Sequence, residues 1–426
     1  MLEPVAVAPR ALVDYEPHAG ADALAEVRRL AEPLRGARIL HVNATAYGGG
    51  VAELLPAMTA LMRDLRLEAE WRVIQGDDAF FAVTKALHNG LQGPPFELTA
   101  GARETFEGAS ERFAAAFEGS YDFVVIHDPQ PVALRRLLPD AAGRWIWRCH
   151  IELTDRDPRA WALLRPLVQA YEAAIYTLAA YAPPDAEGPL LAVIAPSIDP
   201  LSPKNAPLEP GAAGAAVRRF GLDPARPLIT QVSRFDPWKD PLGVVDAYRR
   251  VRKRFPEVQL ALVGSMASDD PEGQLIHAEV MRAVAGERDV HVLSNLDGVG
   301  APEVNAFQRA SDVVVQKSLR EGFGLTVSEA LWKGTPVVGG RVGGIPIQVV
   351  DGETGILVDS IDDCADACAR LLADPDLRRR MGVAGHERVR RHFLVTRELR
   401  DHLALFLALS RGDPSLIPTG DYGGRP

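Results

Sequence analysis

Residues 38–53 read RILHVNATAYGGGVAE and set the expected fold class. The apolar run Arg38–Val42 predicts a buried strand, and Val51–Leu65, which follows three glycines, predicts an amphipathic helix. The same order of short β-branched run, turn and helix recurs along the chain. Such alternation predicts parallel sheets covered by helices on both faces. We therefore expect an α/β fold with doubly wound parallel sheets.

Two series of strands carry this pattern. The first is expected at Arg38–Val42, Glu70–Gln75, Phe123–His127, Arg144–Cys149 and Leu191–Ile194. The second is expected at Leu228–Val232, Gln259–Val263, Val290–Leu293, Val313–Gln316, Pro336–Gly339 and Gly355–Val358. Helices are also expected at Pro241–Phe255 and Glu329–Lys333. Two such series in 426 residues predict two similar domains.

A proline-rich segment, Ala195–Ala216, separates the two series and favours an ordered linker. We place the boundary near Leu208, which gives an N-terminal domain at 1–207 and a C-terminal domain at 208–392. The remaining residues, 393–426, begin with a helix of apolar period. We expect this helix to pack back on the N-terminal domain.

The composition indicates an ordinary globular protein, with 47% hydrophobic and 24% charged residues. The net charge of −10 argues against nucleic acids and anionic membranes as partners, because that affinity comes from clustered Lys and Arg. Three cysteines cannot form a disulfide framework in a chain of this length. No signal-peptide pattern and no membrane-spanning stretch is visible, so a cytoplasmic location is expected.

The glycine run Gly48-Gly49-Gly50 lies between the first strand and its helix. Glycines there let the backbone approach a ligand, and a helix N-terminus adds partial positive charge. This suits a phosphate or a sugar hydroxyl, although a tight turn would have the same sequence. The spacing matches neither the dinucleotide fingerprint nor the P-loop.

A polar cluster follows the second strand and includes Asp77, Lys85, His88 and Asn89. The last three fall at i, i+3 and i+4, so they share one helix face. Loops after strands line the ligand crevice of an open α/β sheet, which makes these residues candidates for binding a polar substrate. A solvated helix face explains the spacing equally well.

The first strand of the second series leads into Ser233-Arg-Phe-Asp-Pro-Trp-Lys-Asp240. Arg234 and Lys239 flank a turn made rigid by Pro237. Two cations at the carboxyl end of a strand suit a diphosphate, with the arginine as a fork and the lysine as a point charge.

A later strand leads into the segment Glu321-Gly-Phe-Gly-Leu-Thr-Val-Ser-Glu329. Its glycines expose backbone donors, and the helix beginning near Leu325 points its N-terminus at the same crevice. Glu321 and Glu329 can each accept two hydroxyl hydrogen bonds, so one suits a sugar and the other a ribose. Stabilisation of a first helical turn is the alternative role for Glu329.

Taken together, SRFDPWKD and EGFGLTVSEA resemble the retaining nucleotide-sugar glycosyltransferases of family 4, which have the GT-B fold of two Rossmann-like domains facing a central cleft. The resemblance implies that Arg234 and Lys239 hold the donor diphosphate, that Glu321 binds the transferred sugar and that Glu329 binds the ribose. It also implies that His150, in WRCHIEL, is the active-site histidine near the donor sugar. Further donor contacts are expected from Gly49, Gly50, Gly322, Phe323, Gly324, Leu325 and Thr326.

The N-terminal half narrows this resemblance. The motifs HVNATAYGGGVAE, VIQGDD, TKALHN and WRCHIEL are similar to those of the trehalose glycosyltransferring synthases and the related trehalose phosphorylases. The synthases imply transfer of glucose from ADP-, UDP- or GDP-glucose to free glucose, with retention, giving α,α-trehalose in a reversible reaction. Acceptor contacts are then expected from Asp77, Lys85, His88, Asn89 and Glu152.

Several alternatives stay open. The enzyme could be a trehalose phosphorylase or another family 4 glucosyltransferase, and a two-lobed sugar-binding protein is the non-enzymatic alternative. No tightly bound cofactor and no protein metal site is expected, since Asp155-Arg156-Asp157 stands where a helix begins at Pro158. Mg²⁺ would enter with the nucleotide. A homodimer is one possible oligomeric state.

Overall fold

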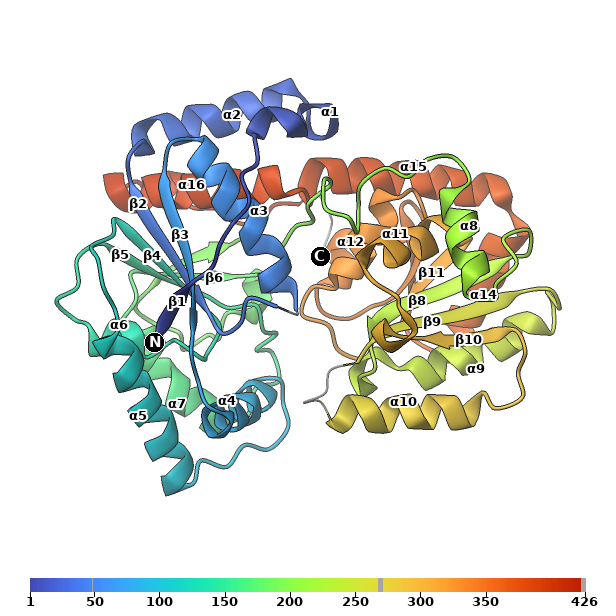
Figure 1. Ribbon diagram of the computed structural model, residues 1–426, viewed down its shortest axis with the longest axis horizontal. Coiled ribbons are helices and arrows are strands. Elements are labelled where there is room, and N and C mark those ends of the chain that lie inside the picture. Colours follow the sequence, from blue (N-terminus) through green and yellow to red (C-terminus); the bar gives the residue numbers. More distant parts are fainter. Residues whose placement is uncertain (48, 267–270, 423–426) are drawn as a thin grey trace. The chain divides into compact units, whose positions relative to one another are not determined.

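The computed structural model describes residues 1–47, 49–266 and 271–422. The chain forms two compact units (Figure 1). The N-terminal unit contains Met1–Ser197 and Val395–Asp421, and the C-terminal unit contains Ile198–Leu394 and Tyr422. Each unit is built on one predominantly parallel sheet. The predicted α/β architecture with doubly wound sheets is confirmed.

The sheet of the N-terminal unit has the strand order β1-β3-β2-β4-β5-β6-β7 over the described residues. The strands are β1 (Leu2–Pro4), β2 (Arg38–Asn43), β3 (Glu68–Ile74), β4 (Phe123–His127), β5 (Arg144–Arg148), β6 (Ala173–Tyr176) and β7 (Leu190–Val193). Neighbours are parallel, except that β1 is antiparallel to β3. The sequence did not predict β1, a short edge strand ending in proline, or β6, which begins with two alanines.

Helices cover both faces of this sheet. They are α1 (Glu16–Ala19), α2 (Ala21–Ala31), α3 (Gly50–Asp64), α4 (Asp78–Leu91), α5 (Ala100–Ala115), α6 (Leu134–Leu137), α7 (Pro158–Val168) and α16 (Val395–Arg411), with 3₁₀ turns η1 (Leu12–Tyr15), η2 (Glu32–Leu34), η3 (Ala179–Tyr181) and η6 (Pro414–Leu416). Phe80 of α4 and Trp161 of α7 share a core with Trp147 of β5. On the other face, Phe406 of α16 stacks on Phe123 with ring centroids 4.5 Å apart. Helix α16 also packs along α2 (Figure 1).

The sheet of the C-terminal unit has the order β10-β9-β8-β11-β12-β13, and every pair is parallel. The strands are β8 (Leu228–Arg234), β9 (Gln259–Ser265), β10 (Val290–Leu293), β11 (Val313–Gln316), β12 (Val337–Gly340) and β13 (Gly355–Val358). The helices are α8 (Ala212–Arg219), α9 (Pro241–Arg252), α10 (Pro271–Ala283), α11 (Ala301–Ala310), α12 (Leu325–Trp332), α13 (Ile345–Gln348), α14 (Ile361–Ala373) and α15 (Pro375–His392), with η4 (Pro237–Lys239) and η5 (Asn295–Asp297). Each of the six strands matches a predicted one.

The strand orders locate the ligand sites that each sheet can form. In the C-terminal unit the order reverses between β8 and β11, and in the N-terminal unit it reverses between β2 and β4. Open α/β sheets bind ligands outside the carboxyl ends of the strands at such a reversal. The segments that follow these four strands are therefore where functional residues are expected.

The proline-rich segment is ordered in the C-terminal unit. Asn305 of α11 donates from Nδ2 to the carbonyl oxygens of Pro203 and Ala206, at 3.1 and 2.9 Å. Arg309 donates to the carbonyl oxygen of Ala206 at 3.2 Å. These contacts hold residues 198–207 in the C-terminal unit, and the chain changes unit between Ser197 and Ile198.

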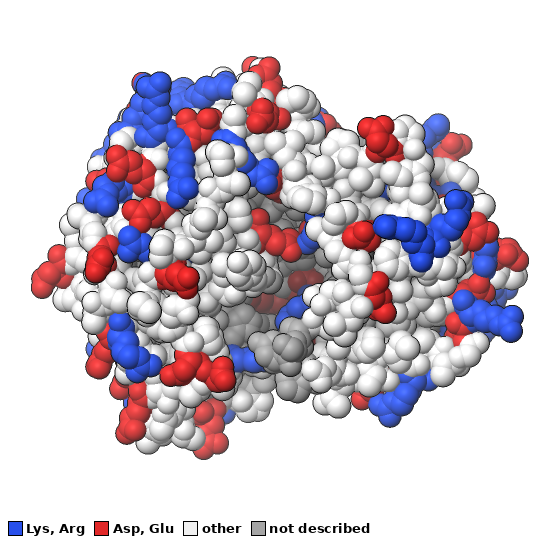
Figure 2. Space-filling model, in the orientation of Figure 1, with Lys and Arg blue, Asp and Glu red and all other residues white. Residues whose placement is uncertain are grey.

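Charged side chains of both signs are interspersed on the face shown in Figure 2. Neither Lys and Arg nor Asp and Glu form a continuous field over either unit in that view. In the part of the chain that the structure describes, no helix has the length and apolar character needed to cross a bilayer.

Candidate active site

The turn after β8 is held by two aspartates. Asp236 accepts a hydrogen bond from Trp238 N at 2.8 Å and caps η4. Asp240 has a left-handed backbone, with φ 49°, and caps α9 by accepting from Gly243 N at 3.1 Å. Gln231 donates from Nε2 to the carbonyl oxygen of Lys239 at 2.7 Å. The backbone of Lys239 is therefore fixed before any ligand binds.

Lys239 and Glu321 meet across the reversal between β8 and β11. The Nζ atom of Lys239 lies 2.7 Å from Oε2 of Glu321, and both side chains are largely buried. Ser318 donates from Oγ to the same carboxylate oxygen at 3.2 Å. The structure thus brings together the predicted cation and the predicted sugar-binding carboxylate.

Arg234 and Lys317 take different positions around this pair. Arg234 is exposed at the end of β8, and its guanidinium lies 3.1 Å from Asp236. Lys317, which sequence reasoning did not select, is buried and pairs with Asp240. The Lys317–Asp240 pair therefore holds the residue next to Lys239. The sequence held a signal for it, because Lys317 is a cation that directly follows the strand β11, four residues before Glu321.

The loop before α12 has the backbone that its glycines allow. Gly324 has φ 82° and is the N-cap residue of α12, with no side chain capping the first turn. Phe323 is buried, and its carbonyl oxygen accepts from Gln348 Nε2. The predicted residue Gly322 lies in this loop, whereas Leu325 and Thr326 begin α12, and Oγ1 of Thr326 donates to Oε1 of Gln316 at 3.3 Å. A first turn without a side-chain cap leaves backbone N–H groups for an anion.

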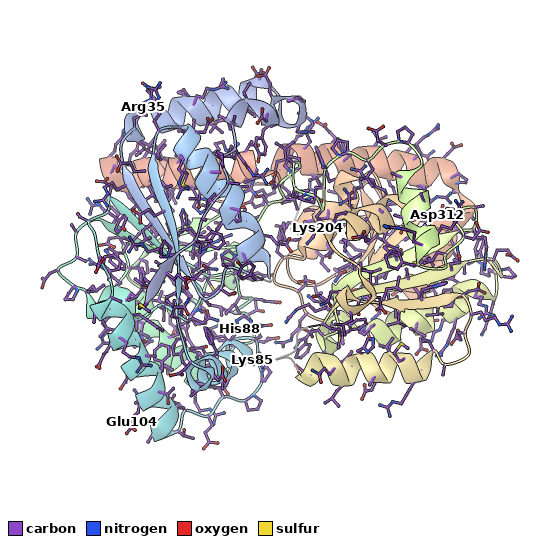
Figure 3. The ribbon with its side chains drawn as sticks, viewed as in Figure 1. Arg35, Lys85, His88, Glu104, Lys204 and Asp312 are labelled. Atoms are coloured by element: carbon purple, nitrogen blue, oxygen red, sulfur yellow. The ribbon has the colours of Figure 1, made fainter. Side chains whose placement is uncertain are left out.

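Glu329 is 1% exposed in the interior of α12. Its Oε1 atom lies 3.4 Å from Nζ of Lys204, which lies beside α12 (Figure 3). Its Oε2 atom has no hydrogen-bond partner among the described residues. A buried carboxylate oxygen without a donor is costly, so a ligand hydroxyl would satisfy it.

Lys333 stands one turn beyond Glu329 and is held by three acceptors. Its Nζ donates to Asn205 Oδ1, Gln308 Oε1 and the carbonyl oxygen of Glu329, at 2.9, 2.7 and 3.0 Å. Burial nevertheless lowers the pKa of this ammonium to about 7. Burial therefore opposes the charged form even though its donors are satisfied.

This shift predicts a pH-dependent stability. Between pH 7.5 and 9.5 the unfolded chain holds a proton on Lys333 that the folded protein has released, so the free energy of unfolding rises with pH by about 1.4 kcal/mol per unit from this group. In Lys333→Met that contribution is absent. Urea unfolding should show the wild type gaining about 2.7 kcal/mol over Lys333→Met across this range.

The exposed Lys253 supplies the matched control. The free energy of unfolding of Lys253→Met should differ from that of the wild type by the same amount at every pH in this range. A pH-independent difference for Lys333→Met would show that Lys333 stays charged in the folded protein.

His150 lies in the N-terminal unit two residues after β5, the strand that neighbours β4 on one side of the reversal. Its backbone N–H donates to Oδ1 of Asp128 at 2.8 Å, and Asp128 has φ 62°. Burial raises the pKa of Asp128 to about 6. The side chain of His150 contacts His127, the last residue of β4, with Nε2 3.1 Å from Nδ1 of His127.

A third histidine, His41, extends this contact into the core, and His402 is buried separately on α16. His127 Nε2 lies 3.1 Å from Nδ1 of His41 on β2. His402 of α16 contacts the carbonyl oxygen of Glu398 through Nδ1 at 2.9 Å. Burial lowers the pKa of His41 and His402 to about 3 and lowers those of His127 and His150 well below the ordinary value. Sequence reasoning missed His41 and His127, although each is a polar residue directly preceded by apolar residues of its strand.

The glycine turn after β2 is open. Gly49 has φ 80°, and a Cβ atom there would meet nothing within 4 Å. Gly50 begins α3, whereas Gly48 lies outside the described residues. Asn43 fixes the start of the turn by donating to the carbonyl oxygen of Thr45 at 2.7 Å. The geometry is suited to close approach of a ligand to the backbone.

The predicted acceptor residues on α4 differ in their surroundings. Asp77 caps α4 by accepting from Phe80 N at 2.8 Å and lies 3.5 Å from Arg112, so it has a structural role. Lys85 and Asn89 are exposed and His88 is half-buried, and Figure 3 shows Lys85 and His88 near each other on this helix. Their role as ligands stays a prediction.

Glu152 and Asp157 are engaged with neighbouring residues. Glu152 accepts from Thr154 Oγ1 at 2.8 Å. Asp157 caps α7 by accepting from Arg159 N at 2.7 Å, and it also accepts from Phe96 N at 3.0 Å. Asp155-Arg156-Asp157 is therefore a helix start. Among the described side chains, no group of three His, Cys, Asp or Glu residues could hold a metal ion.

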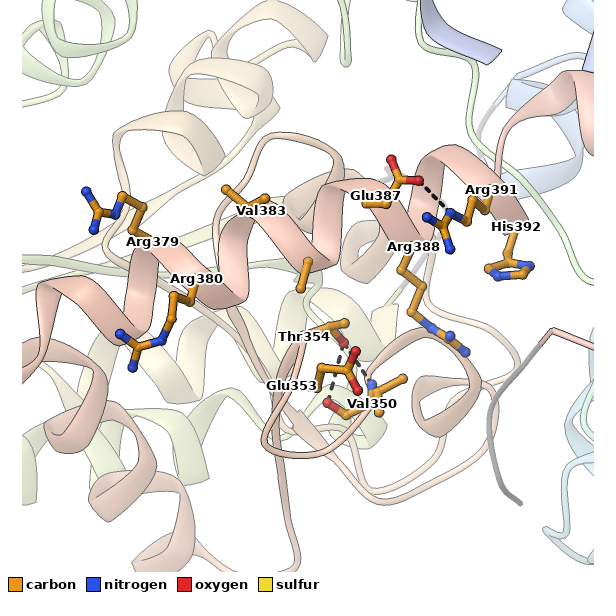
Figure 4. Close-up of a pocket in the computed structure, with 11 residues that line it drawn as sticks. Val350, Glu353, Thr354, Arg379, Arg380, Val383, Glu387, Arg388, Arg391 and His392 are labelled. Atoms are coloured by element: carbon orange, nitrogen blue, oxygen red, sulfur yellow. Dashed lines mark hydrogen bonds and ion pairs between the residues drawn. The ribbon is translucent and has the colours of Figure 1, made fainter. Parts of the chain in front are cut away.

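A cavity of about 770 Å³ lies elsewhere in the C-terminal unit, between α15 and the loop after α13 (Figure 4). Arg380, Arg388 and Glu353 are among its lining residues, and Glu387 pairs with Arg391 at its rim. None of the predicted site residues lines it.

Comparison with known proteins matches both halves of the chain. Residues 41–183 match the family "Trehalose synthase, N-terminal domain", and residues 215–388 match "Glycosyl transferases group 1". The trehalose synthase of Rubrobacter xylanophilus is 50% identical over 96% of this chain and 99% of its own length. That of Pyrococcus horikoshii is 44% identical over 94% of this chain and 97% of its own. A trehalose phosphorylase of Pleurotus pulmonarius is 29% identical over 96% of this chain but only 62% of its own length.

Solved structures are similar to this chain in fold. A sucrose-phosphate synthase from Thermosynechococcus elongatus matches with a TM-score of 0.67 at 18% identity, covering 88% of this chain and all of that one. An E. coli structure titled as trehalose-6-phosphate bound with UDP-2-fluoro glucose matches with a TM-score of 0.69 at 14% identity, covering 87% of this chain and 99% of that one.

The two doubly wound sheets, and the residues at their reversals, define a glycosyltransferase of the GT-B fold. The chain belongs to the trehalose synthase family of these enzymes.

Proposed function

We propose that this enzyme forms α,α-trehalose by transferring glucose from a nucleoside diphosphate glucose to free glucose, reversibly and with retention of configuration. The observation that carries this proposal is the Lys239–Glu321 pair at the β8–β11 reversal, beside the uncapped start of α12. It offers a cation, a carboxylate and backbone N–H groups to one ligand that combines a phosphate with a sugar. The relatives' name, trehalose synthase, supports trehalose as the product.

The residues divide the chemistry between them. The bond from the glucose anomeric carbon to the diphosphate breaks, and a bond from that carbon to an acceptor hydroxyl oxygen forms on the same face. The acceptor proton passes to the leaving phosphate oxygen, so no carboxylate nucleophile is required. Lys239, the α12 N-terminus and Arg234 stabilise the negative charge on the diphosphate, which is usually the largest catalytic contribution.

The carboxylates recognise hydroxyl groups. Glu321 accepts from hydroxyls of the transferred glucose, and Glu329 accepts from the ribose. The Oε2 atom of Glu329, which lacks a partner among the described residues, supports a donor that carries a ribose. In two structures of the similar GT-B fold, the titles name UDP-glucose and UDP with glucose as bound molecules.

A product assay tests the proposal. The enzyme is incubated with ADP-, UDP- or GDP-glucose and free glucose, and we expect a non-reducing disaccharide that trehalase cleaves. Formation of glucose 1-phosphate from trehalose and phosphate, with no product from any nucleotide sugar, would instead identify a phosphorylase. Glu329→Gln sharpens the distinction, because it should raise the KM for a nucleotide sugar and leave a KM for phosphate unchanged.

A further inference from the structure

Three histidines of the N-terminal unit, His41, His127 and His150, form one continuous chain of ring contacts. His41 Nδ1 lies 3.1 Å from His127 Nε2, and His127 Nδ1 lies 3.1 Å from His150 Nε2. The ring centroids are 5.4 Å apart at both steps. The three histidines lie in a row across the sheet, because the strands β2, β4 and β5 that carry or precede them are consecutive neighbours. His41 is paired in register with Val125, so its side chain and that of His127 lie on the same face.

We propose that His41 and His127 are positioning residues that fix the proton of His150 on Nδ1, so that His150 presents a neutral N–H donor to a substrate oxygen. The inference deepens the proposed function, on which it rests for the identity of that substrate. A sugar hydroxyl is the oxygen that fits the donor. The step involves hydrogen bonding only, with no proton transfer to the substrate.

Counting donors and acceptors leaves two ways to place the protons on the three histidine rings. A neutral imidazole has one N–H and one acceptor nitrogen, so each contact needs a donor from one ring and an acceptor from the next. In the first arrangement, His41 donates from Nδ1 to His127, His127 donates from Nδ1 to His150, and the proton of His150 is on Nδ1. In the second, every proton lies on Nε2, and His150 presents a bare Nδ1.

The buried end of the chain favours the first arrangement. The Nε2 atom of His41 is buried and makes no hydrogen bond within residues 1–47, 49–266 and 271–422. The second arrangement would place an N–H there without an acceptor, and buried N–H groups without acceptors are rare in proteins. The first arrangement leaves only an unused lone pair at that end.

The surroundings keep the rings neutral, as this counting requires. Burial is the main cause that lowers the pKa of each of the three histidines, and the Arg148 charge lowers those of His127 and His150 further. Arg148 is paired in register with His127 and is fully buried. Asp128 independently fixes the backbone of His150 by accepting its N–H.

The ¹⁵N NMR spectrum of histidine-labelled enzyme gives the direct test. In the wild type, His150, assigned by its loss in His150→Gln, should carry its proton on Nδ1. In His127→Leu that preference should be lost, and kcat/KM should fall about 10- to 100-fold, by analogy with the loss of a group that orients a metal-ligating histidine. His127→Asn, whose amide can still donate to His150, should restore most of both.

A double-mutant cycle separates positioning from a merely structural role. The effects of His127→Leu and His150→Gln should be strongly non-additive, because His127 acts only through His150. Additive effects, or a wild-type His150 proton on Nε2, would overturn the proposal. If His127→Leu does not fold, His41→Leu takes its place and should weaken the Nδ1 preference. The NMR result does not depend on the reaction, so it stands even if the enzyme proves to use other substrates.

Discussion

Lys239→Met should lower kcat by about 10²- to 10³-fold, the usual cost of removing one preorganised group that stabilises transition-state charge. Lys239 is the largely buried cation that pairs with Glu321 at the β8–β11 reversal, and its backbone is fixed by Gln231 and by the cap residue Asp240. A fixed charge needs little reorganisation as the diphosphate leaves, so its effect falls on kcat. Steady-state kinetics with the nucleotide sugar that gives trehalose measures the loss.

The design of this experiment must allow for the partner that Lys239 leaves behind. In Lys239→Met, Glu321 keeps the hydrogen bond from Ser318 but loses the ammonium 2.7 Å away. Lys239→Arg retains the charge and should recover part of kcat. Lys253→Met, an exposed lysine at the end of α9, is the matched control and should be indistinguishable from the wild type.

Two results would contradict this assignment. If kcat of Lys239→Met is within threefold of the wild type, Lys239 does not stabilise the leaving group. A glucosyl group covalently bound to Glu321, detected by mass spectrometry of the enzyme with its donor, would give that carboxylate the role of a nucleophile.

The C-terminal unit was the more predictable from sequence. All six of its strands were expected, and the two motifs after β8 and β11 became neighbours as soon as the strand order was known. Each motif is local, because its turn residues, cap residues and functional side chains lie within about ten residues of one another. Lys239 and Glu321 could be predicted individually, although their contact could not.

The N-terminal unit was less predictable because its site depends on contacts between distant residues. The contacts from His41 to His127 and from His127 to His150 join three strands, and nothing in the spacing of the histidines indicates that they meet. Asp77 shows the opposite difficulty. A residue that caps a helix has the same sequence signature as one that binds a ligand, and only the structure shows its bond to Phe80 N.

Arg148→Met should lower the free energy of unfolding of the N-terminal unit by about 3 to 5 kcal/mol, the usual cost of removing one partner of a buried ion pair. The guanidinium of Arg148 lies 3.9 Å from Oε1 of Glu398, and both side chains are fully buried. The second oxygen of Glu398 accepts from Ser197 Oγ at 2.6 Å. Burial raises the pKa of Glu398, while Arg148 and then Arg397 oppose that rise.

Three variants isolate the pair. Arg148→Met alone leaves a buried carboxylate, whereas Arg148→Met combined with Glu398→Gln removes both charges and should be less destabilised than the single variant. Arg35, labelled in Figure 3, supplies the control. Arg35→Met breaks its exposed pair with Glu32 in the same unit and should cost at most about 1 kcal/mol. Hydrogen exchange resolved by peptide assigns each loss to a unit: β4 and β5 should lose protection while β8 and β11 do not.

The free energy of unfolding of Arg148→Met should depend on pH, and the protonation of Glu398 sets the direction of that dependence. Without the arginine, the folded variant holds a proton on the buried carboxyl group of Glu398. The unfolded chain does not hold that proton at neutral pH. The free energy of unfolding of the variant should therefore fall as pH rises, by up to about 1.4 kcal/mol per unit, and the gap from the wild type should widen. A gap that is constant with pH, or a double variant as unstable as the single one, would mean that Arg148 stabilises the unit through packing rather than by compensating the charge of Glu398.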